Sequence, residues 1–108
     1  MVKRHDIEKI KSKIIRFSKR LEKKGVKDAK YYVFGSWAEG RQGKYSDIDL
    51  AVVSDEFSGN SFEDSTRLRL LTIGIDTMLE PVAMKTEDFA DKYNSLASEI
   101  KRTGIRVI

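Results

Sequence analysis

The sequence predicts an α/β or α+β fold in which helices flank a small sheet. Two observations carry this expectation: an apolar stripe at helical spacing near the start, and short runs of β-branched and aromatic residues between helical stretches. The chain has 108 residues, of which 40% are hydrophobic and 35% charged, so it has enough apolar material for one core. We therefore expect a single domain over residues 1–108.

The first element is predicted to be a long helix. Its apolar side chains recur at spacings of three and four residues, which is the pattern of one helix face: Ile7, Ile10, Ile14, Phe17 and Leu21. We expect Asp6 to cap its start and Gly25 to take the left-handed position after its end.

Two strands with a short helix between them are expected next. Tyr31–Phe34 has the composition of a strand, and Gly35 follows it directly. Ser36–Glu39 reads as a capping box that opens a short helix. Beyond a polar loop, the apolar run Ile48–Val53 predicts the second strand.

The remaining elements alternate in the same way. We expect a helix over about 62–71 and a strand over about 75–84, in which Pro81 indicates an edge position or a bulge. Thr86 is expected to cap a last helix, and residues 105–108 can add a short strand. The apolar stripe of that last helix comprises Phe89, Tyr93, Leu96 and Ile100.

Composition excludes several classes of function. The absence of cysteine excludes a disulfide framework, thiolate zinc sites and a cysteine nucleophile. A single histidine, His5, argues against a Ser-His-Asp hydrolase and against a multi-histidine metal site. No apolar run approaches the roughly 20 residues of a membrane span, and no signal-peptide core is present, so we expect a cytoplasmic protein.

Positive charge is concentrated at the start of the chain. Residues 1–30 carry twelve Lys and Arg against four Asp and Glu, whereas residues 31–108 carry nine against thirteen. Such a basic helix can bind nucleic acid. The absence of interleaved aromatic residues for base stacking favours a solvated outer face instead.

Asp47 and Asp49 are the first candidates for chemistry. They lie two apart at the start of a strand, so both side chains point to one face. Two adjacent carboxylates resist ionisation unless a cation lies between them, and Mg²⁺ prefers such oxygen ligands. Gly35 and Ser36 begin a helix, where backbone N–H groups can cradle a phosphate. A return of the chain through residues 40–46 would bring Ser36 beside the two aspartates.

Gly35-Ser36 followed by Asp47-Ile48-Asp49 resembles the signature of the minimal nucleotidyltransferases of the polymerase-beta-like superfamily. The stretch FGSWAEGRQGKYSDIDLAVV resembles their nucleotide-binding core, and the resemblance extends over about residues 31–90. It implies a nucleotidyltransferase-type fold with a small mixed sheet flanked by helices. It also implies Mg²⁺-dependent transfer of a nucleoside monophosphate, AMP from ATP, to an acceptor hydroxyl. By this resemblance, Gly35 and Ser36 hold the triphosphate, and Asp47 and Asp49 hold Mg²⁺.

The resemblance also implies a third metal-binding carboxylate on the next strand, close to the attacking hydroxyl and suited to act as general base. Relatives often place it nine residues before the aromatic residue of the last helix, and that count from Phe89 gives Glu80. Other relatives carry aspartate at the position of Met78. Asp76 is the rival candidate in this chain.

One position departs from the family pattern. Glu39 stands where many relatives have a basic residue, which leaves a phosphate contact unassigned. Arg41 and Lys44 lie in the same loop and are candidate substitutes.

The acceptor is expected to lie on another molecule. Larger relatives add domains that bind the acceptor, and this chain has no length for one. Some relatives are antitoxins that adenylylate a small helical toxin of the HEPN class, so we expect such a partner protein, one with an acidic surface that the basic first helix attracts. The alternatives are a non-catalytic antitoxin or adaptor of the same fold, and a nucleic-acid binder that uses the first helix.

Overall fold

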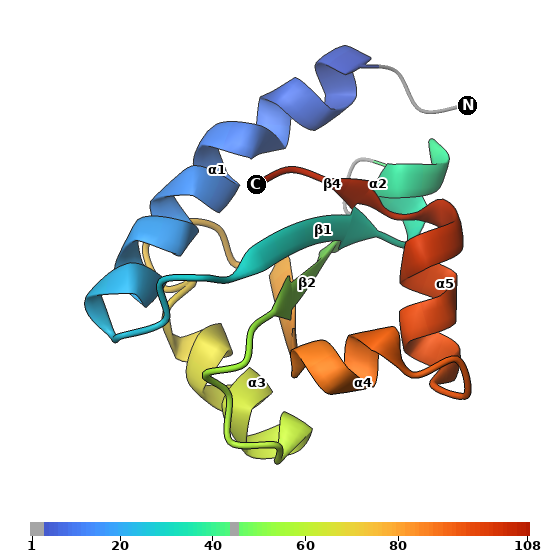
Figure 1. Ribbon diagram of the computed structural model, residues 1–108. Coiled ribbons are helices and arrows are strands. Elements are labelled where there is room, and N and C mark those ends of the chain that lie inside the picture. Colours follow the sequence, from blue (N-terminus) through green and yellow to red (C-terminus); the bar gives the residue numbers. More distant parts are fainter. Residues whose placement is uncertain (1–3, 44–45) are drawn as a thin grey trace.

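The computed structural model describes residues 4–43 and 46–108, and within them the chain forms a four-stranded sheet (Figure 1). Its strands are β1 (Lys30–Phe34), β2 (Ile48–Val53), β3 (Leu79–Met84) and β4 (Ile105–Arg106). They lie in the order β3-β2-β1-β4; β1 is antiparallel to β2 and to β4, whereas β2 and β3 are parallel. The sheet is therefore mixed, as expected.

Helices cover both faces of this sheet (Figure 1). α1 (Arg4–Lys23) and α3 (Ser61–Leu70) lie against one face, and α4 (Thr86–Ala90) and α5 (Ser95–Thr103) lie against the other. The short helix α2 (Ser36–Glu39) directly follows β1. This arrangement confirms the predicted class, a small mixed sheet flanked by helices. In the described part of the chain, no helix is both long enough and apolar enough to cross a membrane.

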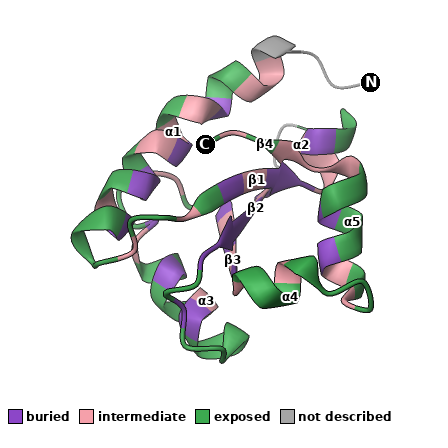
Figure 2. Cartoon of the chain, in the orientation of Figure 1, coloured by how far each residue is buried: buried purple, intermediate pink, exposed green. Residues whose placement is uncertain are grey.

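Two hydrophobic clusters hold the layers together, because alternate residues of each strand point to opposite faces. Leu50 and Val52 of β2 join the cluster under α1 and α3, whereas Ala51 and Val53 join the cluster under α5. Figure 2 shows the buried residues along the strands and on the helix faces turned toward them. Burial of a large apolar side chain contributes about 1.5–3 kcal/mol. The α1 stripe is therefore a main attachment of that helix: Ile10, Ile14, Phe17 and Leu21 are all buried.

The ends of α1 agree only in part with the prediction. The helix already includes Arg4, so Asp6 lies inside the first turn and is not its N-cap. A carboxylate there still interacts favourably with the helix dipole. At the other end, Gly25 has a φ of 102° and donates to Glu22 O, while Val26 N donates to Leu21 O. This is the Schellman termination that the glycine predicted.

The third strand is shorter than predicted. β3 begins at Leu79, because residues 71–78 form turns in which the Asp76 carboxylate accepts a hydrogen bond from Met78 N. Pro81 lies in β3 at the edge of the sheet, as expected. An edge strand tolerates proline because one side of its backbone needs no partner.

The predicted last helix is two helices, α4 and α5. Lys85, not Thr86, occupies the N-cap of α4, and Asn94 caps α5 by accepting from Ala97 N. Tyr93 falls in the turn between them and is 84% exposed, so it is not part of the apolar stripe. Phe89, Leu96 and Ile100 do pack against the sheet.

Candidate functional site

The turn after β1 is built around Gly35. Its φ of 69° and ψ of −147° make it the N-cap of α2, so Ser36 is the first residue of the helix. The predicted capping box is therefore wrong: the cap residue has no side chain, and Glu39 pairs with Arg41 at 3.0 Å. The Ser36 hydroxyl makes no hydrogen bond to any described residue. It is therefore available to a ligand at this helix start.

The antiparallel register of β1 and β2 brings this turn to Asp49. Phe34 is the partner of Asp49 in the ladder, so Gly35 lies next to the Asp49 carboxylate. A Cβ at Gly35 would collide with Asp49 Oδ2 and would lie 3.1 Å from Asp49 Cγ. Both the positive φ and this close approach require glycine at position 35.

The loop between α2 and β2 folds back onto α2. Trp37 Nε1 donates to Ser46 O at 3.5 Å, and Gly43 N donates to Ser46 Oγ at 2.7 Å. These contacts fix the chain just before Asp47. Of the two candidate substitutes for the phosphate contact, Arg41 is paired with Glu39, and Lys44 lies outside the described residues.

The parallel register of β2 and β3 places Asp49 directly opposite Glu80. Paired residues on neighbouring strands share a face. Asp47 lies two residues before Asp49 in the sequence, immediately before the first residue of β2. Asp47 is exposed, whereas Asp49 and Glu80 are each partly buried. The sheet thus places Glu80 at the end where β2 and β3 begin, which is also where the two aspartates lie.

Negative charge accumulates around Asp49. Burial raises the pKa of the Asp49 carboxyl, and the neighbouring carboxylates of Glu80, Asp47 and Glu99 raise it further. Glu99 belongs to α5, which packs across the same face of the sheet. Ionised Asp49 is consequently destabilised unless a cation joins it.

Glu80 already has a cationic neighbour. Arg69 Nη2, from the end of α3, lies 3.3 Å from Glu80 Oε2. Among the described residues, no three acidic or histidine side chains are gathered closely enough to hold a metal ion. The carboxylates therefore lie at the same end of the sheet but do not form a complete set of metal ligands.

The rival acid, Asp76, has a different set of contacts. Lys13 Nζ of α1 lies 2.5 Å from Asp76 Oδ2, and Met78 N donates to Asp76 Oδ1 at 2.8 Å. These hydrogen bonds lower the pKa of the Asp76 carboxyl below its ordinary value. Met78, the third position considered, supplies its carbonyl to Ile48 N. Asp76 thus joins α1 to the turn before β3.

Sequence reasoning assigned no role to three residues near this edge. Arg69 and Glu99 reach the acids only because α3 and α5 pack on the sheet, and no spacing in the sequence indicates either contact. Gln42 lies in the loop after α2, and its Oε1 is buried without a hydrogen-bond donor among the described residues.

The donors at this edge suit a divalent cation and a polyphosphate. Carboxylate oxygens are the ligands that Mg²⁺ prefers, and the mutual repulsion around Asp49 is relieved by a positive ion. At the Gly35 turn no side chain separates the backbone from a ligand, and the Ser36 hydroxyl is free at the start of α2. The residues present therefore fit a metal-bound nucleotide.

Comparison with known proteins finds a solved structure with the same fold and a family to which the chain belongs. One solved structure shares the fold, a chain from the "Crystal structure of the toxin-antitoxin with AMP-PNP", with a TM-score of 0.63 and 23% sequence identity. The match covers 91% of this chain and 72% of that one. No curated protein matches the sequence. Residues 11–107 match the family described as "Nucleotidyltransferase domain", and the chain belongs to that family.

Proposed function

We propose that the protein transfers AMP from ATP to a hydroxyl group on a partner protein in a Mg²⁺-dependent reaction. The observation that carries the proposal is the alignment of Asp49 with Glu80 across β2 and β3, next to the side-chain-free turn at Gly35. Membership of the nucleotidyltransferase family supports the class of reaction. The nucleotide, the metal and the acceptor are our assignments.

Five residues would carry the site. Asp47, Asp49 and Glu80 would hold Mg²⁺, while Gly35 and Ser36 would hold the triphosphate through backbone N–H groups and the Ser36 hydroxyl. Mg²⁺, when bound, supplies positive charge that offsets the phosphates and polarises the α-phosphate.

The reaction needs one proton acceptor. The acceptor hydroxyl oxygen attacks the α-phosphorus, and the bond from that phosphorus to the bridging oxygen of the β-phosphate breaks. Pyrophosphate leaves, and Glu80 takes the proton of the attacking hydroxyl. Its carboxylate is partly exposed, so an acceptor can reach it from solvent.

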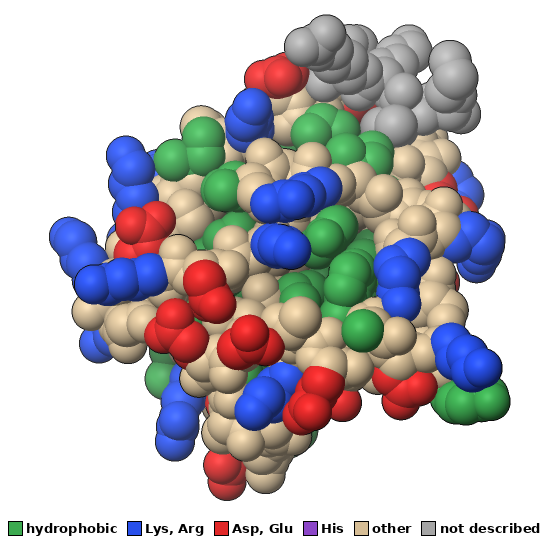
Figure 3. All heavy atoms as spheres, viewed as in Figure 1, with side chains coloured by type: hydrophobic (Ala, Val, Ile, Leu, Met, Phe, Trp, Pro, Cys, Tyr) green, Lys and Arg blue, Asp and Glu red, His purple; other side chains and the backbone are tan. Residues whose placement is uncertain are grey.

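The partner would be an acidic protein, and a small helical toxin of the HEPN type is our first candidate. Lys19 and Lys23 of α1 are exposed, and Figure 3 shows Lys and Arg side chains along the side of the molecule where α1 lies. Such a surface attracts an acidic partner. The related fold in a toxin-antitoxin structure with AMP-PNP is consistent with both a partner protein and a nucleotide.

Nucleic acid is a less suitable partner for α1. Three of its basic side chains bind the turn region before β3: Lys13 pairs with Asp76, and Arg16 and Arg20 donate to backbone carbonyls there. These cations hold the fold together, which reduces the charge available for phosphates.

A non-catalytic binding module is the second candidate function. It is favoured by the Arg69–Glu80 ion pair, which occupies the proposed third acid, and by the lack of a closed acidic cage in the described part of the chain. Such a protein would keep the fold and bind its partner without transferring a nucleotide.

Intact-mass spectrometry distinguishes the two candidates. The purified protein and its partner are incubated with ATP and Mg²⁺, and both chains are weighed. We expect the partner to gain the mass of one AMP moiety on a Tyr, Ser or Thr. The gain should disappear with Asp47→Asn/Asp49→Asn and with Glu80→Gln, while Asp76→Asn should retain much of it.

The contrary outcomes are equally clear. A tight complex without any change of mass would assign the protein to the binding modules. Loss of transfer in Asp76→Asn together with its retention in Glu80→Gln would make Asp76 the third acid.

A further inference from the structure

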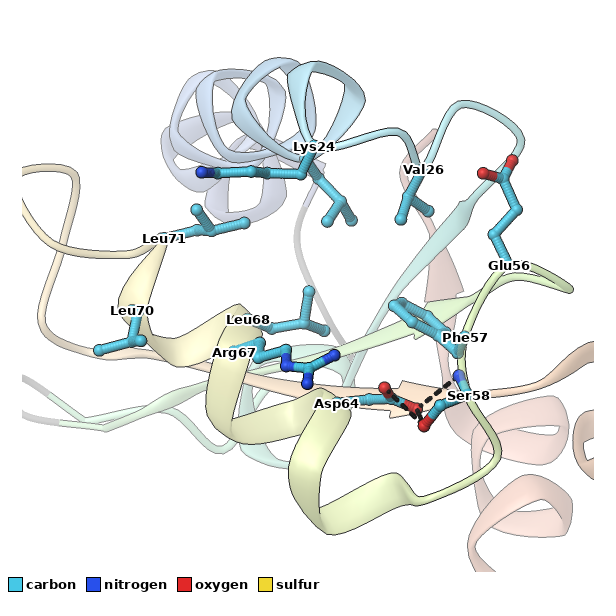
Figure 4. A pocket seen from close by; sticks show the side chains of 11 residues that line it. Lys24, Val26, Glu56, Phe57, Ser58, Asp64, Arg67, Leu68, Leu70 and Leu71 are labelled. Carbon is cyan, nitrogen blue, oxygen red and sulfur yellow. Dashed lines mark hydrogen bonds between the residues drawn. The ribbon is translucent and has the colours of Figure 1, made fainter.

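A cavity of about 530 Å³ lies at the end of β2 opposite the candidate site (Figure 4). It is partly open to solvent and is bordered by the end of α1 with the turn after it, by the segment that follows β2, and by α3. At roughly 3.3 Å per strand residue, Asp49 and the end of β2 are about 13 Å apart. The cavity shares no residue with the proposed nucleotide site.

The walls of this cavity are mainly apolar. They include Leu21, Val26, Phe57, Leu68 and Leu71. Leu21, Phe57 and Leu68 are buried members of the larger core cluster. This part of the wall is therefore held in place by the packing of the core. Pockets that bind small molecules typically have about 300–1,000 Å³ and such apolar walls, with a few polar groups that orient the ligand.

Two cations lie at this cavity, Lys24 in the turn after α1 and Arg67 in α3. Figure 4 shows the Arg67 guanidinium of α3 in front of the apolar wall and the Lys24 side chain extending across the opposite side. Neither forms an ion pair or hydrogen bond with any residue that the structure describes. Because Arg67 presents several N–H groups in one plane, it suits a two-oxygen anion.

The acids at the cavity are already engaged or turned away. Asp64 is buried, and both of its oxygens accept hydrogen bonds from Ser58, whose N and Oγ lie 2.9–3.0 Å away. Glu56 points out of the cavity in Figure 4, and its Oε1 lies 3.4 Å from Lys27 N. The groups left without a partner at the cavity are therefore the two cations.

We propose that this cavity binds a small organic acid with an apolar body, whose anionic group pairs with Arg67 and Lys24. The apolar body of the ligand would shield the apolar walls from water. Its anionic group would form ion pairs with the two cations, which have no ion-pair partner in the described part of the chain. Leu70, 63% exposed, is the most exposed apolar side chain of the lining, whereas Ile73, 67% exposed, does not line the cavity and is not needed by the ligand.

Two fluorescent probes test the proposal on the full chain. 8-Anilino-1-naphthalenesulfonate carries the same rings as N-phenyl-1-naphthylamine and adds a sulfonate. We expect saturable one-to-one binding of the sulfonate probe, at least tenfold tighter than that of the neutral probe. Arg67→Gln should weaken the sulfonate probe about tenfold and leave the neutral probe unchanged. The matched control is Arg102→Gln, an exposed arginine on α5, which should change neither.

A second variant and a spectrum locate the probe. Val26→Trp, at a half-buried wall position, should block both probes, and amide NMR shifts should centre on Phe57 and Leu68. Equal affinities for the two probes, or no effect of Arg67→Gln, would overturn the assignment of an anion site. Shifts centred on Ile73, outside the cavity lining, would instead assign the probe to the exposed apolar surface and also overturn the proposal.

Discussion

Asp49 and Glu80 occupy paired positions on adjacent parallel strands, and the Glu80 carboxylate helps to raise the pKa of the Asp49 carboxyl. The fold therefore holds the carboxylates of Asp49 and Glu80 close together at the end of the sheet where β2 and β3 begin. Such an arrangement costs stability in the absence of a cation and is typical of sites that bind one.

Replacement of Asp49 by asparagine should stabilise the metal-free protein. A folded-state pKa above the unfolded value means that the ionised form opposes folding at neutral pH. After allowance for solvent screening, we expect Asp49→Asn to raise the free energy of unfolding by up to about 1 kcal/mol. Urea denaturation in a chelator measures it, with the exposed Asp55→Asn as a neutral control. A less stable Asp49→Asn protein would show that the carboxylate is structurally required.

Alanine at Gly35 should disrupt both the fold and nucleotide binding. Gly25 and Gly35 both have positive φ, but a Cβ at Gly25 meets nothing within 4 Å, whereas one at Gly35 collides with Asp49. Gly25→Ala should therefore cost about 1 kcal/mol of backbone strain. Gly35→Ala should cost about 1–3 kcal/mol more and abolish ATP binding. Equal costs at the two positions would mean that the Gly35 turn is not held against Asp49.

The Asp76–Lys13 pair should make stability depend on acid pH. Because the folded-state pKa of Asp76 lies below the unfolded value, its contribution is present at neutral pH and is lost as pH falls below about 4. We expect Asp76→Asn to lose about 1–2 kcal/mol at pH 7 and to show a shallower acid dependence than the wild type. A double-mutant cycle with Lys13→Met measures the coupling. Additive effects of the two substitutions would contradict the pairing.

The larger features of the fold could be predicted because their signals are local. The α1 stripe, the Gly25 termination and the apolar run of β2 each depend on neighbours in the sequence. The capping box at Ser36 failed because Gly35, with its positive φ, takes the N-cap position itself. The single last helix failed because Asp91 binds Tyr93 N and Asn94 starts a new helix.

The candidate site shows the limit of this reasoning more sharply. The return of the chain predicts that Ser36 lies beside the two aspartates, and in the structure it is the preceding residue, Gly35, that lies against Asp49. The Lys13–Asp76 contact joins residues 63 apart in the chain, and Arg69 reaches Glu80 only because α3 packs beside β3. No local pattern specifies such contacts. The roles of Gly35, Ser36, Asp47, Asp49 and Glu80 stay predictions.

Removal of Arg69 should strengthen metal binding. Arg69 competes with a cation for Glu80, and an exposed ion pair of this kind contributes about 0.2–1 kcal/mol. We expect Arg69→Gln to tighten Mn²⁺ binding by up to about fivefold, measured by electron paramagnetic resonance without nucleotide. Arg67→Gln, on the same helix, changes the net charge equally and is the control. Equally tighter Mn²⁺ binding in both variants would show that the effect comes from the change in net charge alone. Weaker Mn²⁺ binding by Arg69→Gln would show that Arg69 holds Glu80 in position for the metal.

Isothermal titration calorimetry of ATP tests the proposed metal and nucleotide site most directly. The wild type and the Asp47→Asn/Asp49→Asn variant are each titrated with ATP in the presence and absence of Mg²⁺. Phosphates and carboxylates repel one another without an ion between them, so we expect measurable binding only for the wild type with Mg²⁺. Equal ATP affinity in all four titrations would contradict the account.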